Sequence, residues 1–280
     1  MSLTIGLIIA RDKHEAAEIA EDVERWLTEA GVTVRSESEL LAGASVDLLV
    51  TLGGDGLIMR MAHVFPNIPI LGINVGKVGF LARIEREDWS QALTDIIEGR
   101  YRVQVTPTLN ASVCRVDHEP QSFWAINDVV IRSGLQMIDV ELYIDQQFVN
   151  TYPGDGMIVA TPQGSTAYCM AAGGPVLDAG VRGFAVTPIC AHSPIRTTLV
   201  VPEEANLELV MASDRKADLI LDGTPVEGLS LGDLVQVNKG EHLFHLIILE
   251  GMNFYQAFRS KFNFMIRPNA VPTRPAARTR

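Results

Sequence analysis

The 280-residue chain lacks most signs of a secreted or membrane protein. Its three cysteines, Cys114, Cys169 and Cys190, are odd in number and widely spaced, which fits neither a disulfide framework nor a zinc knuckle. We therefore expect reduced thiols in a cytoplasmic protein. No apolar run approaches the roughly 18 residues of a membrane span. No basic segment precedes the apolar stretch near the N-terminus, as a signal peptide would require.

Positive charge is also scarce. The 23 Lys and Arg residues face 34 Asp and Glu residues, so the formal net charge is −11 and the isoelectric point is about 5.0. Such a chain repels phosphate backbones and anionic lipid, which argues against a general role on nucleic acids or membrane surfaces. A small anionic ligand is still compatible with this charge, because backbone dipoles can bind a phosphate locally.

The remaining composition is that of a globular protein, with 47% apolar and 20% charged residues. Residues 1–100 alternate between two kinds of pattern, which predicts a doubly wound α/β domain. Short apolar runs predict strands at 4–9, 46–51 and 68–73. Apolar residues at helical spacing predict helices at 16–30, 57–65 and 89–97.

From residue 101 the sequence pattern changes to short runs of β-forming residues separated by turn residues. This predicts a β-rich, sandwich-like domain over 101–252. The predicted strands lie at 102–105, 125–131, 140–144, 157–160, 207–210, 218–221, 234–237 and 242–249, with one short helix at 166–172. Residues 267–280 hold three prolines, four arginines and no acid, which predicts a flexible tail.

The sharpest local motif is a glycine-rich turn, Thr-Leu-Gly-Gly-Asp-Gly, at residues 51–56. It follows a predicted buried strand and precedes a helix, where ligands bind in α/β sheets. Gly53, Gly54 and Gly56 allow backbone N–H groups to approach a phosphate. Asp55 would repel that phosphate unless it holds Mg²⁺ or accepts a proton. A tight turn with a helix-capping aspartate explains the pattern equally well. The turn is neither a Walker A loop nor a dinucleotide-binding fingerprint.

Three further segments have unusual composition. Residues 71–81 carry three glycines before Phe80. Asn127 and Asp128 interrupt the apolar strand predicted at 125–131, where they either read ribose hydroxyls or a base edge, or form a satisfied polar pair in the core. Residues 152–175 combine glycines, hydroxyls and Tyr168, a composition that suits a nucleotide.

These motifs, in this order, resemble the NAD kinase family. The resemblance rests on the Gly-Gly-Asp-Gly turn, the Asn-Val-Gly-x-x-Gly-Phe-Leu run, Asn127-Asp128, and the block Gly-Asp-Gly…Thr-Pro-x-Gly-Ser-Thr-Ala-Tyr…Gly-Gly-Pro. Residues 187–193 and 221–223 follow in the family order, so the resemblance spans about 5–253. The long block is the most specific part, since phosphofructokinases and lipid kinases share the Gly-Gly-Asp-Gly turn.

The resemblance implies both a fold and an activity. The fold would be an NAD-kinase-like α/β N-terminal domain and a β-sandwich-like C-terminal domain, with the NAD site between them and residues 253–266 returning to the first. The activity would be transfer of the γ-phosphoryl group of ATP, with Mg²⁺, to the 2′-hydroxyl of the adenosine ribose of NAD⁺. NAD⁺ and ATP would be the partners, and the protein would form a homodimer or homotetramer.

The resemblance also implies roles for individual residues. Asp55 would be the catalytic base, and Gly53, Gly54 and Gly56 would form the phosphate loop. The implied NAD-binding residues are Asp55, Gly56, Phe80, Asn127, Asp128, Asp155, Thr166, Ala167 and Tyr168. The resemblance does not define which residues would bind the metal. Four positions depart from the family pattern: Leu57 replaces a hydroxyl residue, Asp128 replaces a glutamate, and Gln163 and Ala171 stand where serine is frequent.

Two other functions compete with this interpretation. The chain could be a non-catalytic NAD(P)-binding sensor, or another kinase with a Gly-Gly-Asp-Gly turn that acts on a lipid or sugar. The presence of Asp55 argues against a sensor. The long block at 152–175 argues against a lipid or sugar kinase.

Overall fold

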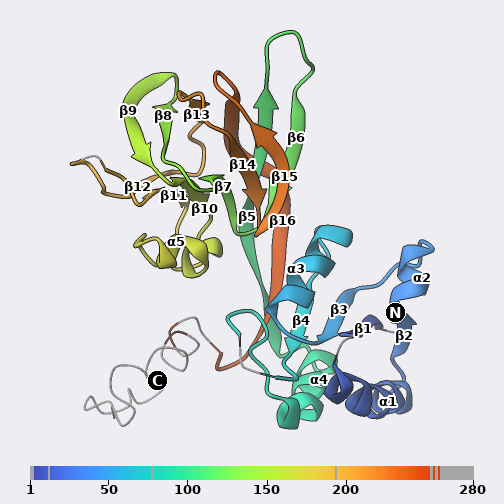
Figure 1. Cartoon of the computed structure of the whole chain (residues 1–280). Helices are drawn as coiled ribbons and strands as arrows, with labels where there is room; N and C mark the ends of the chain where they lie inside the picture. The colour runs from blue at the N-terminus through green and yellow to red at the C-terminus, as the bar shows by residue number, and fades with distance from the viewer. Residues whose placement is uncertain are drawn as a thin grey trace, which may run out of the picture. The chain divides into compact units, whose positions relative to one another are not determined.

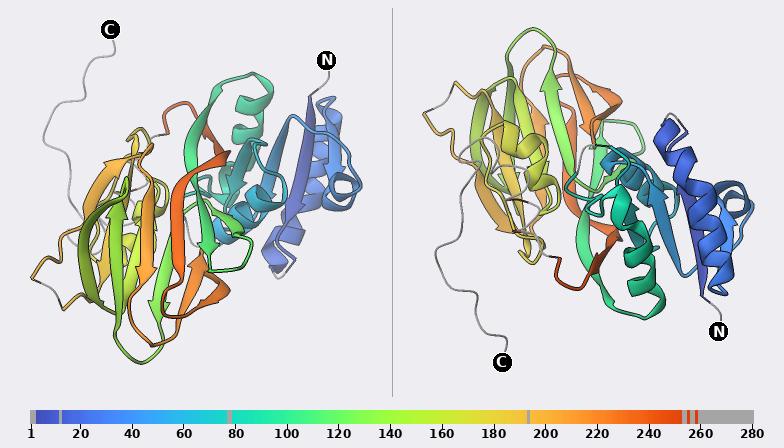
Figure 2. Two further views of the ribbon diagram at one scale, coloured as in Figure 1. Left: turned by 90° about the horizontal axis from the view of Figure 1, so that it is seen from above. Right: turned by 90° about the horizontal axis from the view of Figure 1, so that it is seen from below.

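The computed structural model describes residues 3–11, 13–76, 79–192 and 194–252, together with 255 and 258. The tail predicted at 267–280 and the return predicted at 253–266 lie outside these described residues, apart from 255 and 258. The chain divides into two compact units (Figures 1 and 2). Unit 1 comprises Met1–Met61, Ile68–Val103 and the chain from Leu246, and unit 2 comprises Ala62–Asn67 and Gln104–His245.

Unit 1 is built on a parallel sheet of strand order β2-β1-β3-β4. The end of β16 joins it in parallel to β4, with Leu246 opposite Ile70. The strands are β1 (Thr4–Ile9), β2 (Thr33–Ser36), β3 (Leu48–Leu52), β4 (Ile70–Ile73) and β16 (Leu234–Leu249), and the helices are α1 (His14–Glu29), α2 (Glu37–Leu41), α3 (Asp55–Val64), η1 (Arg86–Asp88) and α4 (Trp89–Ile97). The predicted α/β fold is confirmed.

Continuous apolar runs explain why the central strands of unit 1 form where they do. Every residue of β3 and of β4 is buried, as expected for a parallel sheet covered by helices. Helices α1 and α4 lie side by side (Figures 1 and 2), where Trp26 and Trp89 meet edge to face with ring centroids 6.0 Å apart. The loops after β3 and β4 lie at the carboxyl ends of these parallel strands, where ligands bind in α/β sheets.

Unit 2 contains two antiparallel sheets. One has the order β16-β13-β8-β9, with β5 beside β16 and β6 beside β5; the other has the order β12-β11-β10-β7-β14-β15. The strands are β5 (Tyr101–Cys114), β6 (Gln121–Ala125), β7 (Asp128–Ser133), β8 (Ile138–Ile144), β9 (Gln147–Gly154), β10 (Gly156–Ala160), β11 (Gly183–Ile189), β12 (Leu199–Pro202), β13 (Leu207–Met211), β14 (Ala217–Leu221) and β15 (Thr224–Leu229).

One apolar cluster takes residues from both sheets, among them Leu209 of the first and Phe184 of the second. This common core makes the unit a β-sandwich, and the β-rich prediction is confirmed. A smaller cluster around Cys169 and Ile158 lies on the six-stranded sheet, where η2 (Gly164–Thr166) and α5 (Tyr168–Ala171) are found.

The strand predicted at 125–131 is wrong in one respect. The structure has two strands there: β6 ends at Ala125 and β7 begins at Asp128, so Asn127 lies between them. The carboxylate of Asp222 accepts the backbone N–H groups of Ile126, Asn127 and Asp128. These amides are therefore bound by a side chain and not by a neighbouring strand.

The two strands predicted at 234–237 and 242–249 are a single strand, β16. The residues between the two predicted strands include Gly240, and glycine is common in turns. Gly240 instead lies so close to Thr108 of β5 that a Cβ there would overlap the Thr108 hydroxyl. Thr108 Oγ1 also donates a hydrogen bond to the carbonyl of His242 at 2.6 Å. The glycine therefore permits the close approach of two paired strands, and the chain does not turn. Strands β2, β9, β11, β12 and β15, and all of β6 except Ala125, were not predicted.

Candidate active site

The glycine turn lies between β3 and α3 in unit 1. The amide of Gly53 donates to the carbonyl of Ile73 at 2.9 Å, which ties the turn to the end of β4. Leu57 packs against Gly53, where a Cβ would lie 2.6 Å from Leu57 Cδ2. Helix α3 begins at Asp55. The amides of Leu57 and Ile58 donate to the carbonyl of Gly54, and the amides before them have no partner within the helix. The turn therefore presents backbone N–H groups that can bind an anion.

Asp55 is held by the loop that follows β4. Its Oδ2 accepts the N–H of Phe80 at 2.8 Å, and its Oδ1 accepts those of Leu81 and Ala82 at 3.1 and 2.9 Å. A Cβ on Gly79 would overlap the Asp55 carboxylate, which explains the glycine at that position. The structure thus brings Asp55 and Phe80 together. The carboxylate belongs to the turn after β3 and is held by backbone N–H groups of the loop after β4.

Arg83 adds a cation beside this carboxylate. Its Nε donates to the carbonyl of Phe80 at 2.7 Å, and its Nη1 is buried with no hydrogen-bond partner in the described part of the chain. Burial lowers the pKa of the Arg83 guanidinium from its usual value, against the opposing effect of the Asp55 charge. The sequence analysis did not single out Arg83, because a lone arginine after a strand carries no pattern.

Unit 2 gathers a second group of predicted site residues. A cavity of about 340 Å³ is lined by Asn127, Asp128, Ala167 and Tyr168, together with Arg132 and residues of β14 and its turn. The Arg132 guanidinium lies over the Tyr168 ring, 5.6 Å from its centroid. The cavity therefore combines an amide, a carboxyl group, a cation and an aromatic ring.

Asp222 organises one wall of this cavity, and the sequence analysis assigned it no role. Its carboxylate accepts the N–H groups of Ile126, Asn127 and Asp128 at 2.8, 2.6 and 3.1 Å. A ring nitrogen of His63 lies 2.8 Å from Asp222 Oδ2. Asp222 and the following glycine have φ of 49° and 82°, the left-handed conformation of a two-residue hairpin turn. The Asp-Gly pair is a turn signal in the sequence, but nothing local indicates what its carboxylate binds.

Asp128 has an unusual environment for a carboxyl group. It is 4% exposed. Burial, and then the negative charge of Asp222, raise the pKa of Asp128 to about 7. Near neutral pH this side chain can therefore either donate or accept a hydrogen bond inside the cavity.

The Thr-Pro-Gln-Gly-Ser segment, residues 161–165, holds the backbone of Asn127 by hydrogen bonds. The amide of Thr161 donates to the carbonyl of Asn127 at 2.9 Å, and its hydroxyl donates to that of Ile126 at 2.7 Å. The amide of Gly164 donates to Thr161 Oγ1 at 3.0 Å, and a Cβ on Gly164 would overlap the Asn127 backbone. This part of the motif has a supporting role around the cavity.

Two of the predicted site residues in unit 2 do not line the cavity. Thr166 is buried, and its hydroxyl donates to the carbonyl of Gln163 at 3.3 Å. Asp155 follows β9, and its side chain is hydrogen-bonded to Cys190. That bond and the Asp155 charge raise the pKa of the Cys190 thiol. Cys190 has a φ of 47°, a conformation that few residues other than glycine adopt.

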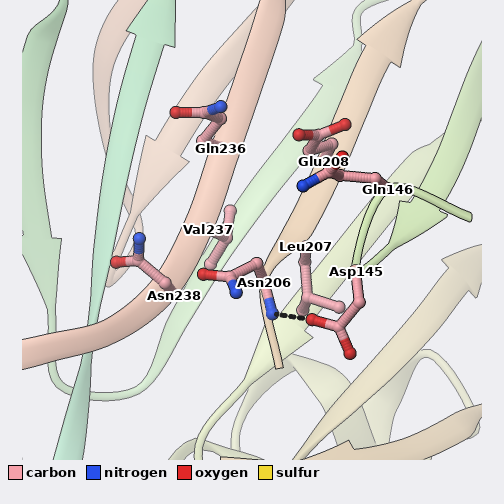
Figure 3. Close-up of a pocket in the computed structure, with 8 residues that line it drawn as sticks. All are labelled: Asp145, Gln146, Asn206, Leu207, Glu208, Gln236, Val237 and Asn238. Carbon is pink, nitrogen blue, oxygen red and sulfur yellow. Dashed lines mark hydrogen bonds between the residues drawn. The ribbon is translucent and has the colours of Figure 1, made fainter. Parts of the chain in front are cut away.

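Another cavity of unit 2, of about 260 Å³, contains none of the predicted residues (Figure 3). It lies among Asp145, Asn206, Glu208 and Gln236, and Asp145 Oδ1 accepts the N–H of Asn206 at 3.0 Å. Among the described residues, no group of three or more His, Cys, Asp or Glu side chains could hold a metal ion. In the same part of the chain, no helix is long and apolar enough to cross a membrane.

Comparison with known proteins places the chain in a family. Residues 39–101 match the ATP-NAD kinase N-terminal domain, and residues 126–249 match the ATP-NAD kinase C-terminal domain. An NAD kinase from Thermomicrobium roseum is 59% identical over 275 residues, which covers 98% of this chain and 96% of that protein. An NAD kinase from Heliobacterium modesticaldum is 35% identical over 276 residues, which covers 92% of this chain and 98% of that protein.

Solved structures agree with this assignment. An NAD kinase from Archaeoglobus fulgidus in complex with ATP matches with a TM-score of 0.73 and 27% identity, over 94% of this chain and 98% of that one. The yeast NADH kinase complexed with NADH has a TM-score of 0.85 and 20% identity, over 98% of this chain and 90% of that one, and shows the shared fold. The chain belongs to the ATP-NAD kinase family.

Proposed function

We propose that the chain is an NAD⁺ kinase, a phosphotransferase with an alcohol group as acceptor. It transfers the γ-phosphoryl group of ATP to the 2′-hydroxyl of the adenosine ribose of NAD⁺. The observation that carries the proposal is the Asp55 carboxylate, held by three backbone N–H groups in the Gly-Gly-Asp-Gly turn. The 59% identity to a named NAD kinase supports it.

In this step a bond forms between the ribose 2′-oxygen and the γ-phosphorus. The bond from the γ-phosphorus to the bridging oxygen breaks, and its electron pair leaves with ADP. The hydroxyl proton passes to Asp55, whose oxygens keep lone pairs beyond the backbone hydrogen bonds. Most of the catalysis comes from positioning and from stabilising charge. Of the predicted phosphate loop of Gly53, Gly54 and Gly56, the amides of Gly54 and Gly56 supply part of that stabilisation, because the amide of Gly53 donates to the carbonyl of Ile73.

Mg²⁺ enters with ATP in this proposal. Mg²⁺ in phosphoryl-transfer sites is usually held by one or two carboxylates and the substrate phosphates. Asp55 is a carboxylate of the turn, and the described residues hold no ready-made metal cluster. These residues fit a metal that the nucleotide carries, and its chemistry is to offset the negative charge of the phosphates.

The cavity of unit 2 is proposed to bind the NAD⁺ nucleoside portions. Asn127 and Asp128 would hold ribose hydroxyls or the nicotinamide-side portion, and the Tyr168 ring would pack against adenine. Phe80, Gly56, Ala167, Asp155 and Thr166 would complete the NAD⁺ contacts. For Thr166 the contact would come from the backbone, because its hydroxyl is bonded to Gln163.

The decisive experiment is a coupled assay of NADP⁺ formation with Mg²⁺. NAD⁺ or NADH is combined with ATP or polyphosphate, and we expect NADP⁺ from NAD⁺ and ATP. A folded protein that binds NAD⁺ but forms no NADP⁺ with any donor would instead be a sensor. Phosphorylation of a lipid or sugar without NADP⁺ formation would indicate a different kinase.

The assembly and location of the protein are also proposals. We propose a cytoplasmic homodimer or homotetramer, on the basis of the family resemblance. Light scattering coupled to size-exclusion chromatography tests the assembly, and a monomeric mass over the working concentration range would contradict it.

A further inference from the structure

The ammonium group of Lys13 lies over the glycine turn of unit 1. Lys13 precedes α1. Its Nζ is 3.2 Å from the position that a Cβ on Gly76 would occupy, and 3.8 Å from that position on Gly54. Gly54 belongs to the loop after β3 and Gly76 to the loop after β4. The ammonium therefore lies beside two glycine backbones, in space that a side chain on Gly76 would crowd.

Lys13 has no acidic partner in the part of the chain that the structure describes. The ion pairs of these residues include the neighbouring Arg11, which binds Glu37 at 3.3 Å, and Arg86, which binds Glu18 at 2.8 Å. None of them includes Lys13, although the chain holds 34 acids and 23 bases. An ammonium beside a helix start that can also bind an anion is an arrangement for a negatively charged ligand.

Asn74 maintains the loop in this arrangement. Its Nδ2 donates to the carbonyl of Gly76 at 2.7 Å, which fixes the backbone next to the ammonium. Asn74 is 3% exposed, and its Oδ1 has no hydrogen-bond partner among the described residues. Asn74 and Gly76 also line a cavity of about 370 Å³ together with Val75, Glu85, Arg86 and Glu87, so this cavity is distinct from the space beside the ammonium. This amide oxygen is an acceptor, so the partner that it lacks is a donor such as an ammonium or a hydroxyl group, and not a phosphate oxygen.

From this geometry we infer that Lys13 binds the phosphate oxygens of the phosphoryl donor above the Gly-Gly-Asp-Gly turn. The inference rests on the proposed kinase function. The ammonium and the first amides of α3 hold the donor phosphates together, and the charge that develops on them during transfer strengthens the contact. Lys13 thus contributes both to donor binding and to the rate of transfer.

The test compares Lys13→Met, which keeps the apolar stem and removes the charge, with the unmodified chain. We expect the KM for ATP to rise and kcat to fall, each by about 10-fold or more, as for a lost hydrogen bond to a charged group. The KM for NAD⁺ should stay within about twofold, because the contact is made to the donor alone. Lys13→Arg, which retains the charge, should recover part of the loss.

Arg11→Met is the matched control. It removes one cation two positions away, from a side chain that is 82% exposed and paired with Glu37. Its donor KM should stay within about twofold of the unmodified value, since an exposed ion pair contributes little. Gly76→Ala complements it: the added Cβ would displace the ammonium while keeping its charge. As a single substitution, Gly76→Ala should raise the donor KM. Combined with Lys13→Met, it should have little further effect.

Calorimetry with inorganic tripolyphosphate and Mg²⁺ separates this inference from the kinase proposal. If binding weakens in Lys13→Met and not in Arg11→Met, the phosphate site stands, even if no NADP⁺ is formed by the unmodified chain. If NADP⁺ is formed and Lys13→Met keeps its donor KM and kcat, the inference is overturned. A loss of several degrees in Tm with equal changes in both KM values would also overturn it, because Lys13 would then be structural.

Discussion

The Asp55 carboxylate combines two tasks at the scale of a single residue. It accepts three backbone hydrogen bonds that hold the 80–82 loop, and it is proposed to take the proton of the acceptor hydroxyl. The sequence indicated an aspartate that would be costly in a phosphate loop without a role. It could not indicate the loop that Asp55 holds, because Phe80 is 25 positions away.

Asp55→Asn should lower kcat by about 10²–10⁴-fold, the range of positioned proton transfer. The variant amide also turns one acceptor into a donor, which then meets a backbone N–H of the 80–82 loop. We therefore expect a lower Tm as well. NAD⁺ affinity should change much less than kcat, because the amide oxygen still accepts a hydrogen bond. Steady-state kinetics and calorimetric NAD⁺ binding on one preparation check this.

The control for that variant is Gly79→Ala, which crowds the carboxylate and leaves its charge in place. It should lower Tm as well. Any fall in its kcat would come from displacement of the Asp55 carboxylate, since the charge is retained. If Asp55→Asn keeps most of its kcat, then Asp55 anchors a loop and is not the base.

Asp128→Asn should change how stability depends on pH. The folded-state pKa of Asp128 is raised from 3.8 to about 7, so the folded state holds this proton more tightly than the unfolded state does. The associated stability is fully present below about pH 4 and is lost as pH rises to about 7, at no more than about 1.4 kcal/mol per pH unit. An asparagine has no such dependence. Urea denaturation from pH 4 to 8 should therefore show the variant gaining stability relative to the unmodified chain, and a constant difference would contradict the raised pKa.

At the scale of elements, local signals were enough where an element depends on its own residues. Strand β1 and helix α4 match their predicted ranges, 4–9 and 89–97, because apolar spacing sets both their extent and their buried face. The break between β6 and β7 was missed because the group that causes it is distant. The hydrogen bond from Asn127 N–H to Asp222 joins residues 95 positions apart. The predicted site residues Asn127 and Asp128 were therefore brought together with their supporting carboxylate only by the fold.

Asp222→Asn should disturb the cavity through the backbone of residues 126–128. An amide offers one acceptor oxygen in place of two, so at least one of the three N–H groups loses its partner, at about 1–3 kcal/mol. We expect a lower Tm and an increase of about 10-fold in the KM for NAD⁺, with a smaller change in the KM for ATP. Asp218→Asn, on the strand β14 that leads into this turn, is the control, since Asp218 is exposed, and it should leave both constants unchanged. Equal effects of the two variants would mean that Asp222 does not support the cavity.

At the scale of the whole molecule, the change of sequence pattern near residue 101 indicated an α/β part and a β-rich part. It did not indicate which residues belong to each compact unit. Unit 1 also contains the end of β16, which pairs with β4 through Leu246 and Ile70. Residues so far apart in sequence share no local pattern, and the return predicted from the family resemblance was placed later, at 253–266. The pairing of distant strands is decided by the packing of the whole chain and not by either segment alone.

The net charge of −11 leads to a prediction for the entire protein. Both proposed substrates are anionic, so the protein as a whole repels them over distances longer than a Debye length, about 10 Å at 0.1 M salt. Raising NaCl from about 20 to 150 mM should therefore increase kcat/KM for MgATP by a few-fold, because repulsion is screened more than short contacts at the site. The increase should be smaller for NAD⁺, which carries less negative charge. Repeating the series with choline chloride separates screening from binding of a particular cation. A kcat/KM for MgATP that falls over this range would show that local positive charge, and not the acidic surface, governs the approach of the donor.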